Sequence, residues 1–444
     1  MSLNKTKMKK YSLLYLSIVI VIFSCKENLQ EQGSEKEIKF FPVEVNHEEI
    51  PLGDNIYAIV GVSLFDGLSE STIENSTVIV RNGLIDKVGP KEEIEIPENA
   101  TVIEGDSLTL MPGLVDAHFH YDHVKHFPTK FVRNGVTSVR DPGQWIEAFD
   151  FERETGDPLP RLFLTGPHID MPPPSWPKDS YMVRDKAEVK EAMDYLFSQN
   201  VSAIKIYQNL PLGLIKEVTD IAHSKGLPVT AHLEITDVRQ AVLAGLDGVE
   251  HITSLGTALV SKRKAEAFRQ KMMADNKSRI SGRLEMWKDI DVNGKKADSL
   301  IKFFEEHQTF LTPTLGPYEY IIEGDKTDST ALIAFQHMSE FIGRCAKANV
   351  RIAVGSHGPW VPYAKLGWSY QHEMDLLSKT GMGNGAIMKA STLENAKFLK
   401  IDHRLGSIEK GKQADLLLIS GNPTENIRDM YNIERVMLNG IWLE

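Results

Sequence analysis

Short apolar runs alternate with stretches of helical periodicity through the centre of the chain. The runs are bounded by Gly, Pro or polar residues, which is typical of buried strands, and the stretches between them repeat apolar residues at helical spacing. The predicted helices include Lys186–Gln199, Leu212–Lys225 and Asp237–Ala244. The predicted strands are Leu108–Ala117, Gly135–Arg140, Arg161–Thr165, Ala203–Tyr207, Pro228–Ala231, Gly248–Glu250, Thr309–Thr314 and Val350–Gly355.

Strands that alternate with helices in this number predict an α/β fold, a (β/α)8 TIM barrel, over residues 111–400. In such barrels the chemistry takes place where the strands end and the following loops begin. Two segments do not follow the repeat. Residues 261–302 are rich in charge and predict a helical insertion, and Asp170–Tyr181, with its prolines and Trp176, predicts an irregular loop that could overhang a site.

Both ends of the chain carry a different pattern, of short strands and tight turns. Residues 51–110 contain Asn82-Gly83 between two strand patterns, and residues 401–444 contain Asn439-Gly440, each a strong hairpin signal. We expect the two segments to pair into one small β-sandwich domain. The strand patterns are Asn55–Val60, Thr77–Arg81, Leu84–Val88, Ala100–Ile103, Ala414–Ile419 and Ile433–Leu443.

Residues 1–25 have the pattern of a secretory signal peptide. A basic start precedes Tyr11–Ser24, which is uncharged, mostly apolar and too short to span a bilayer comfortably. The end of this stretch resembles the lipobox of bacterial lipoproteins, which implies lipidation of Cys25; Phe23 fits that pattern loosely, so a plain signal anchor is the alternative. Residues 26–50, rich in Glu, Lys, Gln and Asn, predict a solvated tether. We therefore expect a protein of the bacterial cell envelope, on the periplasmic or outer-membrane face, held to the membrane by its lipid alone.

The composition and net charge of the chain limit the classes of binding partner that we expect. Of 444 residues, 42% are hydrophobic and 25% charged, which are ordinary globular values for a chain long enough to bury a sizeable core. The net charge of −11 repels phosphate backbones, which excludes nucleic acid as an expected partner. Cys345 is the only cysteine besides Cys25, so lipidation of Cys25 leaves no intramolecular disulfide.

The candidate chemistry begins with His118 and His120, which end the apolar run LMPGLVDAHFH. Strand side chains repeat every second residue, so both imidazoles point to one side and can bind one metal ion. The alternative is that they are ordinary polar residues at a strand terminus. Other candidates lie within or at the ends of later strands, and we expect all of them to meet at one barrel mouth: Lys205, His232, His251 and His357.

Several motifs together resemble the amidohydrolase superfamily, in particular its imidazolonepropionase-like and Xaa-Pro dipeptidase-like members. They are PGLVDAHFH, GVTSVRDPG and, near the C-terminus, LGSIEKGKQADLLLISGNP. The resemblance implies that His118 and His120 bind one metal and that His232 and His251 bind another, with Lys205, if carboxylated, as the bridge. The expected cofactor is one or two divalent metal ions, zinc above all. The alternative for Lys205 is a strand lysine that extends to the barrel mouth.

One position departs from the family pattern. The family ends strand eight with an aspartate that binds metal and accepts a proton, whereas this chain has His357 in Gly355–Pro359. The resemblance implies a metal ligand or catalytic base there, and a histidine cannot do both with one nitrogen. The alternative is a weakened or inactive site. Three carboxylates near the candidate histidines in sequence could orient them: Asp122, Glu234 and Glu250.

The resemblance implies a metal-dependent hydrolase that cleaves an amide-type C–N bond in a small molecule or short peptide, as a dipeptidase or a cyclic amide hydrolase. The alternative is a lipid-anchored metal- or ligand-binding protein that has lost turnover. Tyr207, Trp360 and Tyr363 are the predicted substrate-binding residues; Trp368 and Tyr370 are further aromatic candidates, and loop aromatics can equally serve packing. The sequence indicates neither the substrate nor the oligomeric state.

Overall fold

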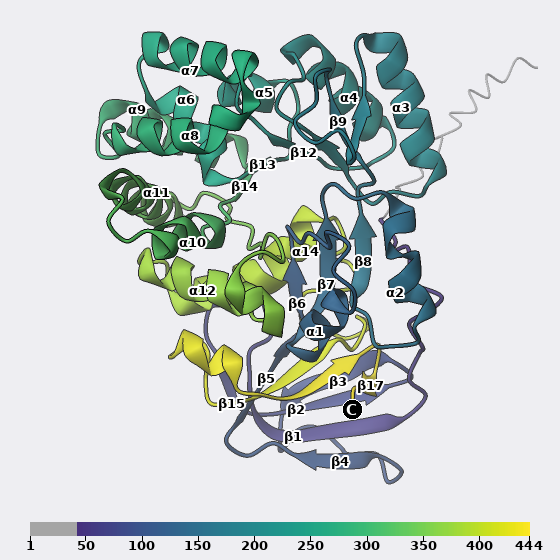
Figure 1. Ribbon diagram of the computed structural model, residues 1–444. Coiled ribbons are helices and arrows are strands. Elements are labelled where there is room, and N and C mark those ends of the chain that lie inside the picture. Colours follow the sequence, from purple (N-terminus) through teal and green to yellow (C-terminus); the bar gives the residue numbers. More distant parts are fainter. Residues whose placement is uncertain (1–41) are drawn as a thin grey trace, which may run out of the picture. The chain divides into compact units, whose positions relative to one another are not determined.

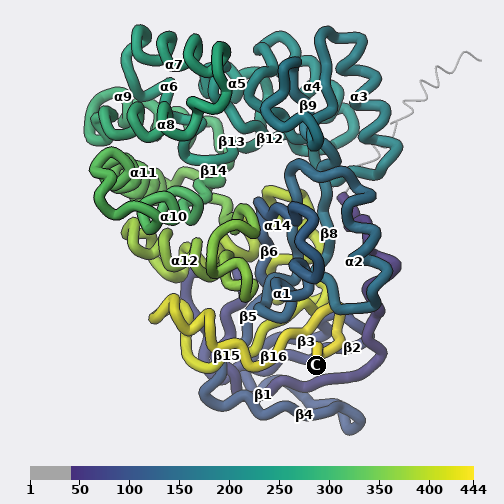
Figure 2. The backbone as a smooth tube through the Cα atoms, viewed as in Figure 1, coloured from purple at the N-terminus to yellow at the C-terminus, as the bar shows by residue number. Residues whose placement is uncertain are grey.

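A computed structural model describes residues 42–444 (Figures 1 and 2). The predicted signal peptide, Cys25 and residues 26–41 of the predicted tether lie outside the described residues. Within residues 42–444, none of the helices combines the length and the hydropathy that a membrane span needs.

Strands from both ends of the chain form one sheet, as the sequence predicts (Figure 1). They are β1 (Ile56–Leu64), β2 (Ile73–Arg81), β3 (Leu84–Pro90), β4 (Thr101–Glu104), β5 (Leu108–Pro112), β15 (Leu416–Ser420), β16 (Ile433–Leu438) and β17 (Ile441–Trp442). The order is β17-β16-β15-β5-β1-β2-β3, and β4 pairs with β1. The two parts of the chain meet where β5 and β15 pair antiparallel. Apolar side chains such as Val62, Val78 and Leu416 give this sheet a core of its own.

The predicted strand Leu108–Ala117 is wrong in one respect, because the structure divides it into two strands. β5 belongs to the sheet of the chain ends, whereas β6 (Leu114–Asp116) begins the barrel. Between them, a Cβ on Gly113 would lie 2.1 Å from Thr137 Oγ1, so the backbone passes close to the next strand. An apolar run carries no mark of a change of sheet, and the domain boundary therefore lies at Gly113 rather than at residue 110.

The barrel strands run parallel in two hydrogen-bonded groups. One group is β6, β7 (Val136–Asp141) and β8 (Arg161–Leu164); the other contains β9 (His168–Asp170), β10 (Ser180–Met182), β11 (Ile204–Ile206), β12 (Val229–His232), β13 (Gly248–Glu250) and β14 (Phe310–Thr312). The groups are joined on one side by the amide of Ser202, which donates to Leu164 O at 2.8 Å. β9 and β10 occupy the two ends of the loop that the sequence predicts to be irregular.

The predicted eighth strand, Val350–Gly355, is not a regular strand. Single bridges join Ile352 to Leu311 of β14, and His357 to Phe119 just after β6. The side chain of Asn395 accepts from Val354 N at 3.0 Å and donates to Val354 O at 2.8 Å. The side chain of Asn395 thus replaces a neighbouring strand as the hydrogen-bond partner of Val354. The extended segment still connects β14 to the end of β6 through its two bridges.

Helices separate the barrel strands, and several begin at an aspartate cap. Asp185 and Asp237 each accept hydrogen bonds from backbone amides of the first turn, so α3 and α5 start where the sequence predicts. The predicted insertion, residues 261–302, is helical as expected and comprises α7, α8 and most of α9. The helices are α1 (Phe127–Arg133), α2 (Asp150–Glu154), α3 (Lys186–Ser198), α4 (Leu212–Ser224), α5 (Val238–Leu243), α6 (Gly256–Leu259), α7 (Lys262–Ala274), α8 (Arg279–Lys288), α9 (Lys295–His307), α10 (Gly316–Gly324), α11 (Ser329–Lys347), α12 (Ser369–Lys379), α13 (Asn384–Lys389) and α14 (Asn395–Phe398).

The last part of the predicted tether, residues 42–50, is packed at Pro42, Glu44, Asn46 and Ile50 and exposed at Val43 and residues 47–49, so the prediction of a solvated segment is wrong in part. Glu44 is buried and forms ion pairs with Arg161 of β8 and with Arg404. Arg161 also binds Asp415, next to β15, through Nε at 2.7 Å and Nη2 at 3.0 Å. Although burial alone would raise the pKa of Glu44, the hydrogen bond from Arg404 and the charges of both arginines lower it to about 2. These buried charges attach the segment to the barrel. The polar composition of the segment predicts a solvated tether instead.

Candidate active site

The predicted residues come together at one end of the barrel. A pocket of about 540 Å³ is lined by Lys205 of β11, His232 at the end of β12, His251 just after β13, and His357, with His120 from the β6 end. His118 lies beneath it, with its ring centroid 4.6 Å from that of His251 and 5.0 Å from that of His357. The convergence expected from the strand positions is therefore present in the structure.

His118, His120 and His357 form the tightest group, with one potential ligand atom of each within 4.8 Å of the others. His118 and His120 face each other through their Nε2 atoms at 3.1 Å. His118 donates from Nδ1 to the carboxylate of Glu250 at 2.6 Å, so its Nε2 carries the lone pair. On the other side of His120, Nδ1 lies 3.6 Å from Asp141 Oδ1. Two imidazole nitrogens directed at one point beside a third imidazole fit a bound cation.

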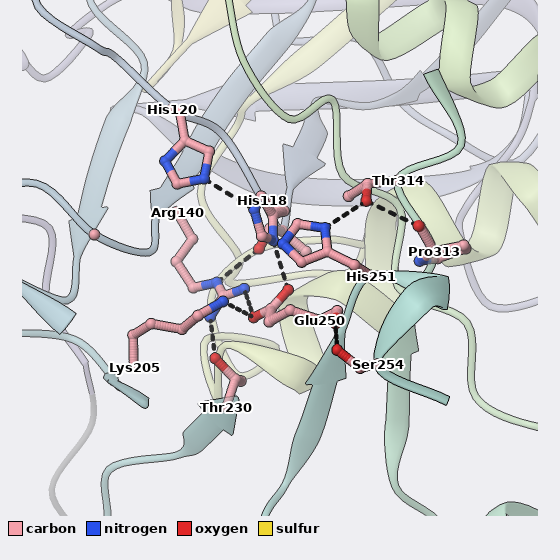
Figure 3. Close-up of polar contacts among 12 residues, drawn as sticks. His118, His120, Arg140, Lys205, Thr230, Glu250, His251, Ser254, Pro313 and Thr314 are labelled. Atoms are coloured by element: carbon pink, nitrogen blue, oxygen red, sulfur yellow. Dashed lines mark hydrogen bonds and ion pairs between the residues drawn. The ribbon is translucent and has the colours of Figure 1, made fainter. Parts of the chain in front are cut away.

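Glu250 connects this group to two buried cations, as Figure 3 shows. One oxygen accepts from His118, and the other faces Arg140 Nη2 and lies 3.8 Å from Lys205 Nζ. Arg140, from the GVTSVRD motif, also donates to Thr230 Oγ1 at 2.9 Å. Burial would raise the pKa of Glu250, but Arg140 and Lys205 hold it well below its usual value, so the carboxylate stays ionised.

His251 is oriented by Thr314 (Figure 3). Thr314 Oγ1 donates to Pro313 O at 2.8 Å and lies 2.7 Å from His251 Nδ1, so it must accept a hydrogen from that nitrogen. The Nε2 atom of His251 is left as the ligand nitrogen. His251, Thr314 and His357 all have positive φ angles, of 64°, 49° and 68°, a conformation that non-glycine residues seldom adopt and that is frequent at functional sites.

His232 is held by a pair of charged residues. Its Nε2 lies 3.0 Å from Glu234 Oε1 and 2.6 Å from Arg283 Nη2, and Glu234 and Arg283 form a buried ion pair. Its Nδ1 is buried and has no hydrogen-bond partner among residues 42–444. Arg283 can only donate, so Nε2 cannot accept from Arg283 and donate to Glu234 at the same time. In either tautomer Nδ1 is the nitrogen without a partner among residues 42–444, and it offers a lone pair to a ligand when the hydrogen is on Nε2. Glu234 thus orients His232, and Glu250 orients His118. Asp122 lines the pocket but forms no hydrogen bond or ion pair with the candidate histidines.

His357 lacks the orienting oxygen that His118, His232 and His251 have. Its Nδ1 is buried with no hydrogen-bond partner in the described part of the chain, as is Nδ1 of His232. Its ring lies 4.5 Å from that of Trp360, in an edge-to-face arrangement. The sequence alone left the role of this residue open, and the structure adds that one of its nitrogens is unpartnered.

Burial sets the protonation states of the site. It lowers the pKa of His118 to about 3 and those of His232, His251 and His357 well below their usual value. Neutral imidazoles are the form that binds metal. Burial also lowers the pKa of Lys205 to about 7; Glu250 opposes this effect and Arg140 adds to it. Part of the Lys205 population is therefore a neutral amine near neutral pH, which is the form that can react with carbon dioxide.

Three further residues line the pocket that the sequence analysis did not name. His168, in β9, is buried, its Nε2 has no hydrogen-bond partner within residues 42–444, and its ring lies 4.5 Å from that of Tyr207 in a tilted arrangement. It follows the third barrel strand in the segment LTGPHID, so the rule that identified the other histidines could have found it. Arg279 and Arg283 belong to α8 of the insertion. They reach the pocket through the tertiary fold, and no pattern in the sequence marks them as pocket residues.

The predicted substrate-binding aromatics divide into two groups. Tyr207 and Trp360 line the pocket, together with Trp176 from the loop expected to overhang it. Tyr363 does not line it: its ring stacks on His372 at 3.8 Å and its hydroxyl donates to Gly316 O at 3.4 Å. The other two aromatic candidates also serve packing, Trp368 against Tyr431 and the buried Tyr370 through a hydrogen bond to Val115 O.

Comparison with known proteins shows which family the chain resembles in sequence. The model of the amidohydrolase family matches residues 109–443. An adenine deaminase 2 of Shouchella clausii (strain KSM-K16) is 32% identical over 82 residues, a match that spans only 17% of this chain and 14% of the deaminase.

Similar solved structures include a Xaa-Pro dipeptidase with methionine bound in its active site, with 21% identity, a TM-score of 0.69, and 88% of this chain and all of that chain covered. A molinate hydrolase has 19% identity and a TM-score of 0.68 over 89% of this chain and 96% of its own. An A. niger ochratoxinase has 15% identity and a TM-score of 0.66 over 87% and 95%. At these identities the likeness shows a shared fold, a TIM barrel with a small β domain.

Proposed function

Because the chain belongs to the amidohydrolase family, we propose that it is a metal-dependent hydrolase that cleaves an amide-type C–N bond in a small molecule or short peptide. The observation that carries the proposal is the arrangement of the histidines. His118 and His251 each donate from one nitrogen to an oxygen of the protein, so the other nitrogen is available to a metal ion, and Nδ1 of His232 has no partner among residues 42–444. Metal-ligating histidines are typically oriented in this way.

The metal ligands in this proposal are His118 and His120 for one divalent ion, and His232 and His251 for a second, with zinc as the metal. Imidazole nitrogens suit zinc, and the unpartnered Nδ1 of His232 supports a ligand at that point. Lys205, carboxylated through its neutral amine, is the proposed bridge. Its buried position beside Glu250 makes a negatively charged carbamate depend on the presence of metal, because the two anions would otherwise repel each other.

A divalent ion bound here would polarise the scissile carbonyl and make water easier to deprotonate. We assign the proton transfer to His357, because it stands where the family has its proton-accepting aspartate and its unpartnered Nδ1 can accept a proton from water and pass it to the leaving amine. His168, whose Nε2 is unpartnered in the described chain, is placed to hydrogen-bond the substrate in the same pocket.

The test measures metal content and hydrolysis on the same samples. Purified protein should contain zinc, or bind it after reconstitution, and should release amines from a panel of dipeptides, N-acyl amino acids and cyclic amides. His118→Ala and His251→Ala should each lower metal content and thermal stability together. Exposed His307→Ala, far from the site in α9, is the matched control. Metal binding without hydrolysis would favour the binding-protein alternative, and protein that never binds metal would contradict the metal-dependent hydrolase.

We further propose that the protein acts in the bacterial cell envelope, anchored by lipid on Cys25. This part of the proposal rests on the sequence pattern of residues 1–25 alone.

A further inference from the structure

Arg279 is a cation that lines the pocket, and the carboxylate on which its charge acts, Glu234, is already paired with Arg283. Its Nη1 donates to Tyr207 Oη at 3.2 Å, and its guanidinium lies over the ring of Trp176, 5.5 Å from the centroid. Within residues 42–444, no carboxylate lies within 4.0 Å of it, whereas the buried Arg140 and Arg283 are each paired with a glutamate. Most of the hydrogen-bond donors of Arg279 are therefore free to meet a ligand.

The position of Arg279 relates it to the proposed reaction centre. The ring of Tyr207 lies 4.7 Å from that of His232, and the hydroxyl of the same tyrosine contacts Arg279. The guanidinium is thus separated from a candidate metal ligand by the length of one tyrosine side chain. In an amide derived from an amino acid, the carboxylate is separated from the scissile carbonyl by the amide nitrogen and one carbon, so the two groups can engage neighbouring parts of one pocket.

The rest of the pocket is mainly apolar. Ile280 and Leu284 of α8, Ile321 of α10 and Trp360 line it. Trp360 lies beside His357, after the segment that follows β14 in the strand order, whereas Tyr207 and His232 stand at the ends of β11 and β12. A planar guanidinium binds a carboxylate through paired hydrogen bonds, and an apolar wall favours an apolar group.

We propose that the substrates are N-acyl amino acids or dipeptides with an apolar acyl side, and that Arg279 binds their carboxylate. This inference rests on the proposed hydrolase function. In the reaction, water supplies a hydroxyl group to the acyl carbon and a proton to the nitrogen as the C–N bond breaks, which yields a carboxylic acid and a free amino acid. Arg279 belongs to the insertion, so the insertion supplies the recognition of the amino-acid half, and the barrel strands supply the hydrolytic groups.

The first test compares N-hexanoyl-leucine with N-hexanoyl-leucinamide, which lacks the carboxylate. The wild-type protein should prefer the acid. Arg279→Met, which keeps the aliphatic stem, should lower kcat/KM for the acid by about 10- to 100-fold, mainly through KM, and leave the amide unaffected. Arg279→Lys should restore part of the loss. Arg263→Met, exposed on α7 of the same insertion, is the matched control and should change neither rate.

The second test measures binding of the same two compounds to metal-free protein by calorimetry, where no turnover occurs. Binding of the acid that is lost in Arg279→Met supports the carboxylate site even if the loaded protein hydrolyses neither compound, in which case only the hydrolase proposal fails. Equal hydrolysis of acid and amide, unchanged in Arg279→Met, would overturn the carboxylate site and leave the hydrolase proposal standing. Metal-free protein that binds neither compound, or binds both equally, also overturns it.

The acyl half is tested with Trp360→Ala. This variant should weaken binding of N-hexanoyl-leucine and leave binding of N-acetyl-leucine, which has a shorter acyl group, nearly unchanged. An equal effect on both compounds, or no effect on either, would overturn the assignment of the apolar wall to the acyl side.

Discussion

Replacing Glu250 with glutamine should weaken metal binding and destabilise the fold at the same time. The carboxylate is fully buried, accepts from His118 Nδ1 at 2.6 Å, faces Arg140, and lies 3.8 Å from Lys205 Nζ. Glutamine keeps the shape of the side chain but removes its negative charge. His118 then loses the anion that fixes its tautomer, and two buried cations lose their counter-charge.

The two effects have different magnitudes. Loss of an orienting partner lowers metal affinity by about 10- to 100-fold, which corresponds to about 1.4–2.7 kcal/mol of binding free energy. A buried cation left unpaired lowers the free energy of unfolding by about 3–5 kcal/mol. Competition with a chromophoric zinc chelator measures the first quantity, and urea unfolding of the metal-free protein measures the second.

Glu44→Gln is the matched control, since it also removes a buried carboxylate that pairs with arginine, but one that lies among Arg161 and Arg404 rather than at the histidines. This variant should lose stability and keep its zinc affinity. The reasoning is refuted if Glu250→Gln binds zinc as tightly as the wild type, because His118 would then not depend on that carboxylate.

Other consequences can be tested in the same way. His357→Asn should abolish hydrolysis with metal content unchanged, and His357→Asp should retain or raise the rate because it restores the family residue; a wild-type rate in the Asn variant would remove both the base and the ligand role. Addition of ¹³C-bicarbonate with zinc should give a carbamate signal by NMR that Lys205→Met lacks, and a signal that persists in the variant would contradict the assignment. Cys25→Ser should move the protein from the membrane fraction to a soluble or precursor form, and unchanged partition would refute lipidation. The folded pKa of Glu44, about 2, lies below that of an unfolded glutamate, so its contribution to stability is present above about pH 5 and declines as the pH falls towards 2; Glu44→Gln should show a smaller loss of unfolding free energy over that range.

The fold could be predicted because its main signals are local. Apolar runs that alternate with stretches of helical periodicity predicted the barrel. The hairpin signals at Asn82 and Asn439 predicted strands at both ends of the chain, and these strands pair into one sheet. The division at Gly113 was not predictable, because a strand that changes sheets has the same side-chain pattern as one that does not. The packing of residues 42–50 was missed because the burial of Glu44 depends on arginines more than a hundred residues away.

In the candidate site, too, the sequence predicted the residues that follow a local rule and missed those that depend on tertiary packing. The positions of His118, His232 and His251 follow from one rule, that barrel strands end at a common mouth, and His168 obeys that rule as well. Arg279 and Arg283 follow no such rule, since the path of an insertion across the barrel depends on tertiary packing that has no periodic signature. The prediction that Tyr363 binds substrate missed for a related reason: its position in sequence is close to His357, but its ring packs on His372 and does not line the pocket.

The pairing of β5 with β15 has a consequence for how the protein reaches its native state. Thr109 Oγ1 donates to Gly421 O across 312 residues of chain, so β15, one of the two neighbours of β5, is made long after β5 itself. Contacts of such long range form slowly, and until they form β5 presents an unpaired edge that can join other chains. The sheet therefore cannot be completed before the intervening barrel has been made, and β5 needs protection from aggregation until then.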